Sequence, residues 1–523
     1  MKKVIIAIIV FTSAVCAQTM PKGYELGGST LKKTNDETPA GNTIEDILAI
    51  GDTIWLATGE GLSRSLDNGV TWTNYYNTEA FGTESVATVA YNNGAIWAST
   101  WHLSKDVEGA FEGSGLRYSL DNGETWTIVP QPLDEPGDTL VTYGNNILYA
   151  EAETKAGDNL IRDIDFLNNT IFIADHAGGF RKSSNMGQTW QRVVVPPDYL
   201  DSIKPTDTLN FRMQPKRKNE PEHHLNYIAY SLEITNDGVI FAGTAGGINK
   251  SDDGGISWVK FNHTNQANSI SGNHIIEMNY NEFDKSLWAT TWKAEGQTEY
   301  WAVSRTTNGG NNWEVFLPGF RAHEFDFISY GDGPSQVIVA SEEGVYRSYN
   351  DGILWLTAPQ IFDSITKVKL ASNNFRSIEI QEGESENNIW VGSNSNGMGR
   401  ITEQQGASAW DGLWKVFLAS EKLTDPSSTK AFPNPFSPSQ EKIKIQFSTN
   451  NTDAEISIRI FDFGMNLVKT LLQNAPRTSA FDEYFEFWDG RNEKGKVVPN
   501  GVYFYRIDIG NNDPLFGKIM ILN

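Results

Sequence analysis

Six copies of one eight-residue pattern recur along this chain of 523 residues. Successive copies start 54, 64, 68, 55 and 42 residues apart. The copies are SLDNGVTW (Ser65–Trp72), SLDNGETW (Ser119–Trp126), SSNMGQTW (Ser183–Trp190), SDDGGISW (Ser251–Trp258), TTNGGNNW (Thr306–Trp313) and SYNDGILW (Ser348–Trp355). A fixed pattern at such intervals is typical of a repeat architecture, in which each repeat folds as one supersecondary unit.

Three positions of the pattern explain what each copy does. The third is Asp or Asn, whose side chain accepts backbone N–H groups just ahead of it and so holds a tight turn. The fifth is always Gly, which suits a left-handed backbone conformation. The eighth is always Trp, whose large apolar ring can pack between neighbouring sheets. The third and eighth residues are Asp67 and Trp72, Asp121 and Trp126, Asn185 and Trp190, Asp253 and Trp258, Asn308 and Trp313, and Asn350 and Trp355.

Strand patterns surround each copy. An apolar strand, a Gly-rich turn and an alternating strand precede it, as in IFAGTAGGINKS before the fourth copy. A seventh unit, IWVGSNSNGMGRI (Ile389–Ile401), keeps the strands but has a decayed pattern before Trp414. With a short strand ahead of each pair, such as Ile44–Ile50, and one after each Trp, every unit has four strands. Seven such units predict an all-β, seven-bladed β-propeller; six blades remain an alternative if the last unit is something else.

The pattern closely resembles the Asp-box, or BNR repeat, of sialidase-like β-propellers. That resemblance implies the propeller fold, and it implies that the Asp residues of the boxes are scaffold and not catalytic groups.

The N-terminus, MKKVIIAIIVFTSAVCAQ, has two lysines, an apolar stretch and small residues, which predicts a secretory signal cut after Ala17. A lipoprotein anchor at Cys16 is disfavoured because Val15, and not a small residue, precedes it. No other segment is apolar enough to span a membrane. Because Cys16 is the only cysteine, the expected mature chain has neither a disulfide nor thiol chemistry.

The formal net charge is −23, and becomes −25 without Lys2 and Lys3. An acidic chain argues against nucleic acid as a partner, since nucleic acid requires a basic face. From the predicted signal peptide we expect a secreted protein, either released or attached to the outer cell surface.

A different pattern begins after Trp414. SEKLTDPSSTK (Ser420–Lys430) has the composition of a linker, and the alternating strands that follow predict a small β-sandwich. FPNPF, WDG, NGVYFYRI and the terminal KIMIL closely resemble the immunoglobulin-like C-terminal sorting domain of type IX secretion cargo, related to the sandwich of flagellar hook-capping proteins. The resemblance implies the type IX machinery as a partner; a sandwich that merely packs or binds is the alternative. The expected organisation is a signal peptide at 1–17, an extension at 18–42, the propeller at 43–419, a linker at 420–430 and the sandwich at 431–523.

The large insertions fall on one predicted face of the propeller, which favours a binding surface there. Aromatic side chains in these loops can stack on sugars or on partner side chains, or else cover their own loops. Three arginines near the starts of first strands could clamp a carboxylate, or pair with channel acids such as Asp163, Asp326 and Glu379. The candidate ligand-binding residues are Trp101, His102, Arg162, Asp163, Arg212, Trp292, Trp301, Arg321 and Arg376.

These observations favour a non-enzymatic propeller that binds an extracellular glycan or protein. The alternative is a glycoside hydrolase, which needs two carboxylates flanking the scissile bond; Asp163, Asp175 and Glu277 are candidates, but no catalytic set can be assigned. A third reading is an assembly scaffold, whose sign would be a broad apolar patch. The sequence has no HExxH motif, phosphate loop or calcium loop, so we expect neither a metal nor a cofactor.

Overall fold

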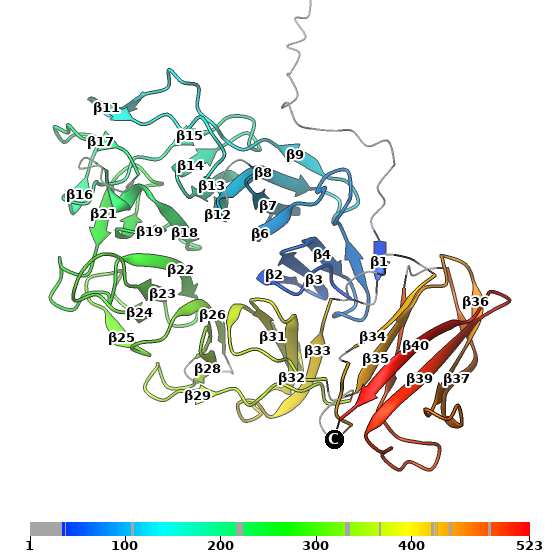
Figure 1. Ribbon diagram of the computed structural model, residues 1–523. Helices are drawn as coiled ribbons and strands as arrows, with labels where there is room; N and C mark the ends of the chain where they lie inside the picture. Colours follow the sequence, from blue (N-terminus) through cyan, green and yellow to red (C-terminus); the bar gives the residue numbers. More distant parts are fainter. Residues whose placement is uncertain are drawn as a thin grey trace, which may run out of the picture.

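The computed structural model describes residues 34–36, 38–105, 109–215, 223–329, 335–365, 368–419, 423, 425, 427–432, 434–438, 442–479 and 483–522. Across these ranges the chain is strands and turns apart from one short 3-10 helix, η1 (Leu225–Tyr227). Its strands form seven sheets of four or five strands, a smaller added sheet and a two-sheet sandwich. The predicted all-β fold, a propeller followed by a small sandwich, is therefore confirmed (Figure 1).

Each blade is one antiparallel sheet whose four main strands follow one another in the sequence. Blades one to three are β2 (Ile44–Ile50), β3 (Thr53–Thr58), β4 (Gly61–Ser65) and β5 (Trp72–Asn74); β6 (Ser85–Asn92), β7 (Ala95–Leu103), β8 (Phe111–Ser119) and β9 (Thr127–Val129); and β12 (Ile161–Leu167), β13 (Thr170–Asp175), β14 (Gly179–Ser183) and β15 (Gln191–Arg192). Blades four and five are β18 (Ala229–Ile234), β19 (Ile240–Thr244), β20 (Gly247–Ser251) and β21 (Trp258–Phe261); and β22 (His274–Asn281), β23 (Ser286–Trp292), β24 (Ala302–Thr306) and β25 (Glu314–Phe316). Blades six and seven are β26 (Ala322–Ile328), β27 (Gln336–Ser341), β28 (Gly344–Ser348) and β29 (Leu356–Thr357); and β30 (Phe375–Gln381), β31 (Glu386–Ser393), β32 (Met398–Gln404) and β33 (Gly412–Phe417).

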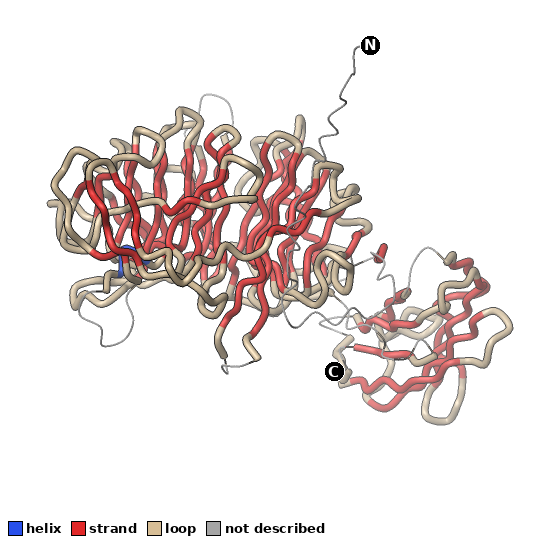
Figure 2. The backbone as a smooth tube through the Cα atoms, turned by 90° about the horizontal axis from the view of Figure 1, so that it is seen from above, coloured by secondary structure: helices blue, strands red, loops and turns tan. Residues whose placement is uncertain are grey.

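The first strands of the blades form a closed ring. Strands β2, β6, β12, β18, β22, β26 and β30 each contact the next, and β30 contacts β2. Seen from above in Figure 2, the strands cross a thick disc whose two faces are made of loops. The last blade takes all four main strands from one segment, so the ring closes by contacts between blades seven and one. Asn42, for example, accepts the N–H of Ala419 at 2.7 Å and donates to its carbonyl at 3.0 Å.

The eight-residue copies form the turns that the sequence predicts. In the first copy, Oδ1 of Asp67 accepts the N–H of Thr71 at 2.8 Å, and Gly69 has a φ of 80°. The sequence assigned no role to the first position, but Ser65 Oγ accepts the N–H of Gly69 at 2.7 Å and donates to Asp67. The equivalent Ser or Thr bond to glycine occurs in all six copies. Each turn is thus held by two side chains.

The tryptophan that ends each copy packs against the preceding blade. Trp126 of blade two lies 5.9 Å from Trp55 of blade one, and Trp355 of blade six lies 6.4 Å from Trp288 of blade five, measured between ring centroids. Large buried rings between adjacent sheets supply much of the hydrophobic stabilisation of such a fold.

Several strands are additions to this plan. β1 (Thr34–Asp36) pairs with β5, and β16 (Ser202–Ile203) pairs with β21. A separate sheet, β10 (Leu140–Tyr143), β11 (Asn146–Ala150) and β17 (Arg212–Met213), lies outside the ring near blades three and four (Figure 1). The sequence leaves open whether Tyr24–Lys33 adds a closing strand to the last blade, and these residues lie outside the described ranges.

The C-terminal sandwich stands beside blades one and seven (Figures 1 and 2). One sheet is β34 (Thr429–Phe432), β35 (Ile443–Phe447) and β38 (Tyr484–Trp488); the other is β37 (Leu467–Arg477), β36 (Ala454–Phe461), β39 (Gly501–Ile509) and β40 (Leu515–Ile521). Its own core includes Ile445, Ile458, Trp488 and Ile519, all inaccessible to solvent. Nowhere in the described ranges is there a helix long and apolar enough to cross a membrane.

Candidate functional site

Every first strand begins with an irregularity in its pairing to the second strand of the blade. In β12 the register shifts between Ile161 and Asp163, so Arg162 has no partner across the ladder. Corresponding shifts occur in the other six blades. A β-bulge turns the extra residue out of the regular alternation and often re-aims a side chain beside a functional site. The residues skipped in this way include Glu45, Arg162, Tyr230, His323 and Arg376.

These bulges lie at one mouth of the ring, where first strands begin and second strands end. Arg162 Nε donates to Nδ1 of His176 at 3.2 Å, and its guanidinium carbon lies 5.0 Å from the ring centre of Tyr230. Tyr230 is 4.2 Å from His274, centroid to centroid. The ring of Trp292 lies between two imidazoles, with centroid distances of 6.3 Å to His274 and 5.2 Å to His323. We call these six residues the mouth belt; it runs across blades three to six.

The imidazoles of the mouth belt are neutral. A guanidinium can only donate, so Nδ1 of His176 is an acceptor and its proton is on Nε2. Burial, and then the charge of Arg162, lowers the pKa of His176 to about 3 and that of His274 to about 4. Burial, and then Arg376, lowers the pKa of His323 to about 4. The positive charge of the belt therefore belongs to Arg162 at neutral pH.

The three arginines singled out in the sequence have different surroundings. Arg376 forms an ion pair with Glu45 at 2.7 Å. Arg321 pairs with Glu342 at 2.8 Å and lies over the ring of Trp301 at 4.6 Å. Arg162 has no ion pair with any carboxylate in the described part of the chain; its pKa is lowered by burial, an effect that Tyr230 and Glu45 partly offset. None of the three pairs with Asp163, Asp326 or Glu379, the alternative considered from sequence.

Deeper in the ring, carboxylates of the first strands bind backbone and not arginine. Six of them accept an N–H from the first strand of the next blade. We call the six that do so the seam carboxylates: Asp46 to Val89 (2.8 Å), Asp163 to Leu232 (2.6 Å), Asp165 to Ile234 (2.6 Å), Glu324 to Ile378 (2.9 Å), Asp326 to Ile380 (2.6 Å) and Glu379 to Ala49 (2.7 Å). The last of these bonds joins blade seven to blade one and helps to close the ring.

Burial raises the pKa of every seam carboxylate. The pKa rises to about 7 for Asp46 and Asp326, to about 6 for Asp163 and to about 8 for Asp165, where Asp163 adds to the effect of burial. For Glu324 and Glu379 it lies well above the usual value. The backbone N–H bonds act in the opposite direction but do not outweigh burial.

Other residues predicted for the site are more scattered. Trp101 packs against Phe111 of its own hairpin, at 5.0 Å between centroids. The adjacent His102 lies 3.0 Å from Glu84. Arg212 is in the added sheet outside the ring, where its guanidinium covers Tyr149 at 4.8 Å. Lys216, Arg217 and Lys218, which follow Arg212 closely in the sequence, lie outside the described residues.

The carboxylates considered for glycosidase chemistry are engaged within the fold. Asp163 is a seam carboxylate. Asp175 is wholly buried, 3.6 Å from Arg181, and accepts a hydrogen bond from Gln131. Glu277 accepts the N–H of Met278 at 3.0 Å. Among the described residues, no group of three or more His, Cys, Asp or Glu side chains has the arrangement of a metal site.

No protein-family model matches this chain, and no curated protein matches its sequence. Solved structures match its fold. An ancestral GH74 enzyme is similar with a TM-score of 0.52 and 15% identity, over 94% of this chain and 63% of that one. The extracellular domain of a putative hybrid two-component system from B. thetaiotaomicron gives 0.45 and 13%, over 94% and 57%. PorZ, a surface component of the type IX secretion system of Porphyromonas gingivalis, gives 0.40 and 13%, over 91% and 65%.

This chain thus spans less than two thirds of the length of each of these three structures. At 13 to 15% identity the likeness concerns the fold alone. The chain is a β-propeller protein.

Proposed function

We propose that this protein is a non-catalytic extracellular binding protein, and that its propeller takes a glycan or a protein at the mouth belt through an anionic group on that ligand. The observation that carries the proposal is Arg162. Its guanidinium is set on a bulge at the mouth, with a neutral imidazole and a phenol ring as neighbours, and no carboxylate of the described ranges is paired to it.

The chemistry of the belt suits an anion beside a flat or apolar surface. Arg162 has two terminal amino groups that can hold a carboxylate or a sulfate by parallel hydrogen bonds. The Nε2–H of His176 adds a neutral donor. Trp292 supplies an aromatic ring nearby, and rings of this kind stack on sugar faces and on partner side chains.

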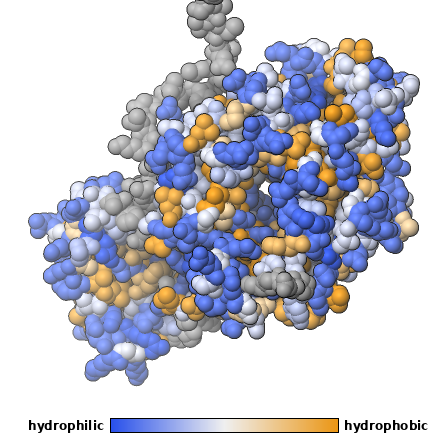
Figure 3. All heavy atoms as spheres, turned by 180° about the vertical axis from the view of Figure 1, so that it is seen from behind, coloured by the Kyte–Doolittle hydropathy of each residue, from blue (hydrophilic) through white to orange (hydrophobic). Residues whose placement is uncertain are grey.

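A binding role is favoured over hydrolysis by the way the carboxylates are used. A glycosidase needs two carboxyl groups placed about 5 to 10 Å apart on either side of the scissile bond. The seam carboxylates each hold a backbone N–H of the adjacent blade, and Asp175 is enclosed. A scaffold built on a broad apolar face is also disfavoured, since hydrophobic residues lie in separate groups among hydrophilic ones on the face shown in Figure 3.

We also propose that the C-terminal sandwich is the signal that directs export of the protein. Its resemblance to type IX sorting domains, and its separate core, support transport of the propeller out of the cell and release or attachment at the surface. Fusion of residues 431–523 to a secreted reporter should give export in a type IX host, and a reporter that stays inside such a host would reject this role.

The test of the binding role is a screen of the full chain on arrays of acidic and neutral glycans and of acidic peptides, with chromogenic glycosides assayed in parallel. We expect retention of ligands that carry carboxylate or sulfate, with no product released. Arg162→Gln should weaken binding at least tenfold, because the amide loses the charge and the paired donors.

Arg459→Gln in the sandwich is the matched control, since Arg459 is bound to Asp508 at 2.7 Å, far from the mouth, and should leave binding unchanged. Equal binding by Arg162→Gln, or turnover that depends on one channel carboxylate, would refute the proposal.

A further inference from the structure

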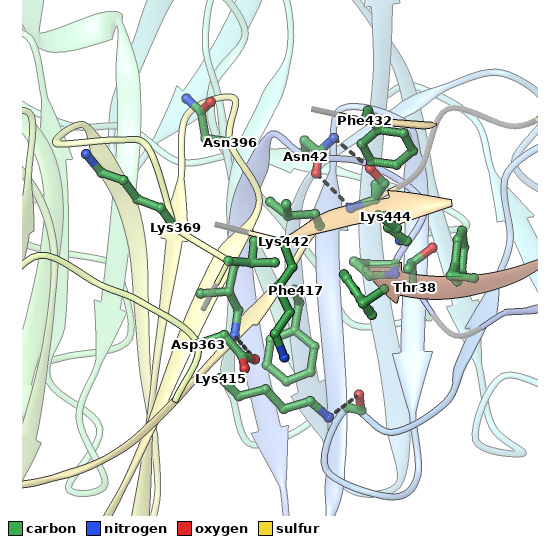
Figure 4. A pocket seen from close by; sticks show the side chains of 18 of the residues that line it. Thr38, Asn42, Asp363, Lys369, Asn396, Lys415, Phe417, Phe432, Lys442 and Lys444 are labelled. Carbon is green, nitrogen blue, oxygen red and sulfur yellow. Dashed lines mark hydrogen bonds between the residues drawn. The ribbon is translucent and has the colours of Figure 1, made fainter. Parts of the chain in front are cut away.

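A cleft of about 970 Å³ lies between the propeller and the sandwich. Its propeller wall includes β33 of blade seven, the first box turn and the link into blade seven. Its sandwich wall is the outer face of the sheet β34-β35-β38 (Figure 4). One hydrogen bond crosses beside it, from Lys442 Nζ to the carbonyl of Ile365 at 3.2 Å. The volume is that of a ligand site, and apolar surface predominates in it.

The cleft is basic although the protein is strongly acidic. Five lysines and one acid, Asp363, are among the described residues that line it. The lysines are Lys369, Lys415, Lys430, Lys442 and Lys444. A positive cleft in a chain with a net charge of −23 concentrates anions locally. The ligand that fits must therefore carry negative charge.

Phenylalanine and lysine alternate on the sandwich wall. Phe432, Lys444 and Phe487 face one another across the three strands and form one row. In the next row, Phe485 lies opposite Gln446. Lys444 Nζ is 3.4 Å from the ring centre of Phe485, so cation and ring already contact each other. On β35 the residues Ile443, Ile445 and Phe447 belong to the core, and on the other side Lys444 is 9% exposed, because the rings of Phe432 and Phe485 lie against it.

Asp363 is the one carboxylate among the described residues that line the cleft; the cleft's other side-chain acceptors, such as those of Thr38, Thr71 and Ser395, are neutral. Both oxygens of Asp363 accept backbone N–H groups, from Ile365 and from Val416. The side-chain oxygen of Asn42 accepts the N–H of Ala419. Carboxylates, which only accept, match the ammonium groups.

The spacing of side chains on the sandwich wall indicates which kind of ligand fits the cleft. Side chains on one face of a strand repeat every second residue, about 6.6 to 6.8 Å apart. An extended polypeptide lying along the sheet has the same repeat. Its acidic and apolar side chains would then meet the lysines and phenylalanines of the wall in register.

We propose that this cleft is a second binding site, separate from the mouth belt, and that it takes an extended acidic polypeptide segment in which carboxylate and apolar side chains alternate along the face turned to the sheet. The ammonium groups hold the carboxylates, and the phenyl rings cover the apolar side chains.

The probe is a capped nine-residue peptide with glutamate and phenylalanine alternating at its odd positions and serine or threonine at its even ones. Its affinity for the full chain is measured by calorimetry or fluorescence anisotropy. We expect binding that weakens with salt, and at least tenfold weaker binding to Lys369→Glu and to Phe487→Ser. Both residues are exposed, so neither substitution should prevent folding.

Lys518→Glu, an exposed lysine on β40, reverses the same charge outside the cleft and should bind the probe as the unsubstituted chain does. Arg162→Gln should also bind it normally, which separates this site from the mouth belt. Absence of binding would overturn the proposal, and so would cleft variants that bind the probe as tightly as the unsubstituted chain. Binding of the matching lysine peptide, or tighter binding of a sulfated glycan in the cleft, would also overturn it.

Discussion

The wall and the mouth of the central channel are made by the same seven strands, yet they use polar side chains in opposite ways. On the wall, Glu379 and the other seam carboxylates accept N–H groups of the neighbouring blade. At the mouth, a bulge interrupts the ladder, and Arg162 has no carboxylate partner among the residues that the structure describes. Polar side chains that bind backbone groups of the next blade hold the ring together, whereas a polar side chain that is not used in this way can contact a ligand. The difference separates the structural acids from the proposed binding residues.

The largest expected effect is a change of stability with pH, caused by the seam carboxylates on the wall of the central channel. A carboxyl whose pKa is raised on folding binds more protons in the folded state, so its contribution is present below the unfolded pKa near 4 and is lost as the pH rises through the folded pKa. For the seam carboxylates that window runs from about pH 4 to pH 8. At about 1.4 kcal/mol for each unit of pKa shift, Asp46 alone should lower the free energy of unfolding by a few kcal/mol between pH 5 and pH 8.5, and the other seam carboxylates act in the same direction. Urea unfolding at both pH values measures it, and stability that rises with pH would contradict the account of the wall.

Substitution of one seam carboxylate gives the next largest effect. Glu379→Ala leaves the N–H of Ala49 without its partner between blades seven and one, which should cost about 1 to 3 kcal/mol of stability. Glu379→Gln keeps an acceptor and removes the buried charge, so it should be nearly neutral at pH 5 and stabilising at pH 8.5. Equal losses for the two variants in chemical denaturation would mean that the seam bond is unimportant.

A smaller effect, close to zero, is expected for ligand binding at the mouth as the pH changes. With pKa values of about 3 to 4, His176, His274 and His323 stay neutral from pH 5 to pH 8. Affinity for a carboxylate or sulfate ligand should therefore vary less than twofold over this range in titration calorimetry. A steep gain below pH 6.5 would show that imidazolium groups, and not Arg162 alone, carry the charge.

Much of the propeller could be predicted from the sequence because the residues that form each turn act locally. The Asp or Asn, the glycine and the tryptophan of each copy act within one turn or on the adjacent blade, as Asp67 and Trp126 do. The first residue of the copy, Ser65 in blade one, was missed although it repeats as well, because a serine before a turn has no single role.

The mouth was harder to predict because a bulge depends on how two strands pair. Tyr230 and His323 lie on bulges, one residue from where simple alternation would place them, and nothing in a single strand marks that shift. The acids at positions 163, 326 and 379 were correctly placed on first strands, but arginine was considered as their partner. Their actual partners are backbone N–H groups, which a sequence pattern does not display.

The most direct test of this division is to compare Arg162→Gln with Glu379→Gln in the full chain, measuring for each the affinity for a ligand found by array and the free energy of unfolding at pH 8.5. We predict that Arg162→Gln loses the ligand at least tenfold while its stability stays close to that of the unsubstituted chain, and that Glu379→Gln binds normally while its stability changes. A Glu379→Gln protein that is folded but no longer binds, or an Arg162→Gln protein that binds as before, would contradict it.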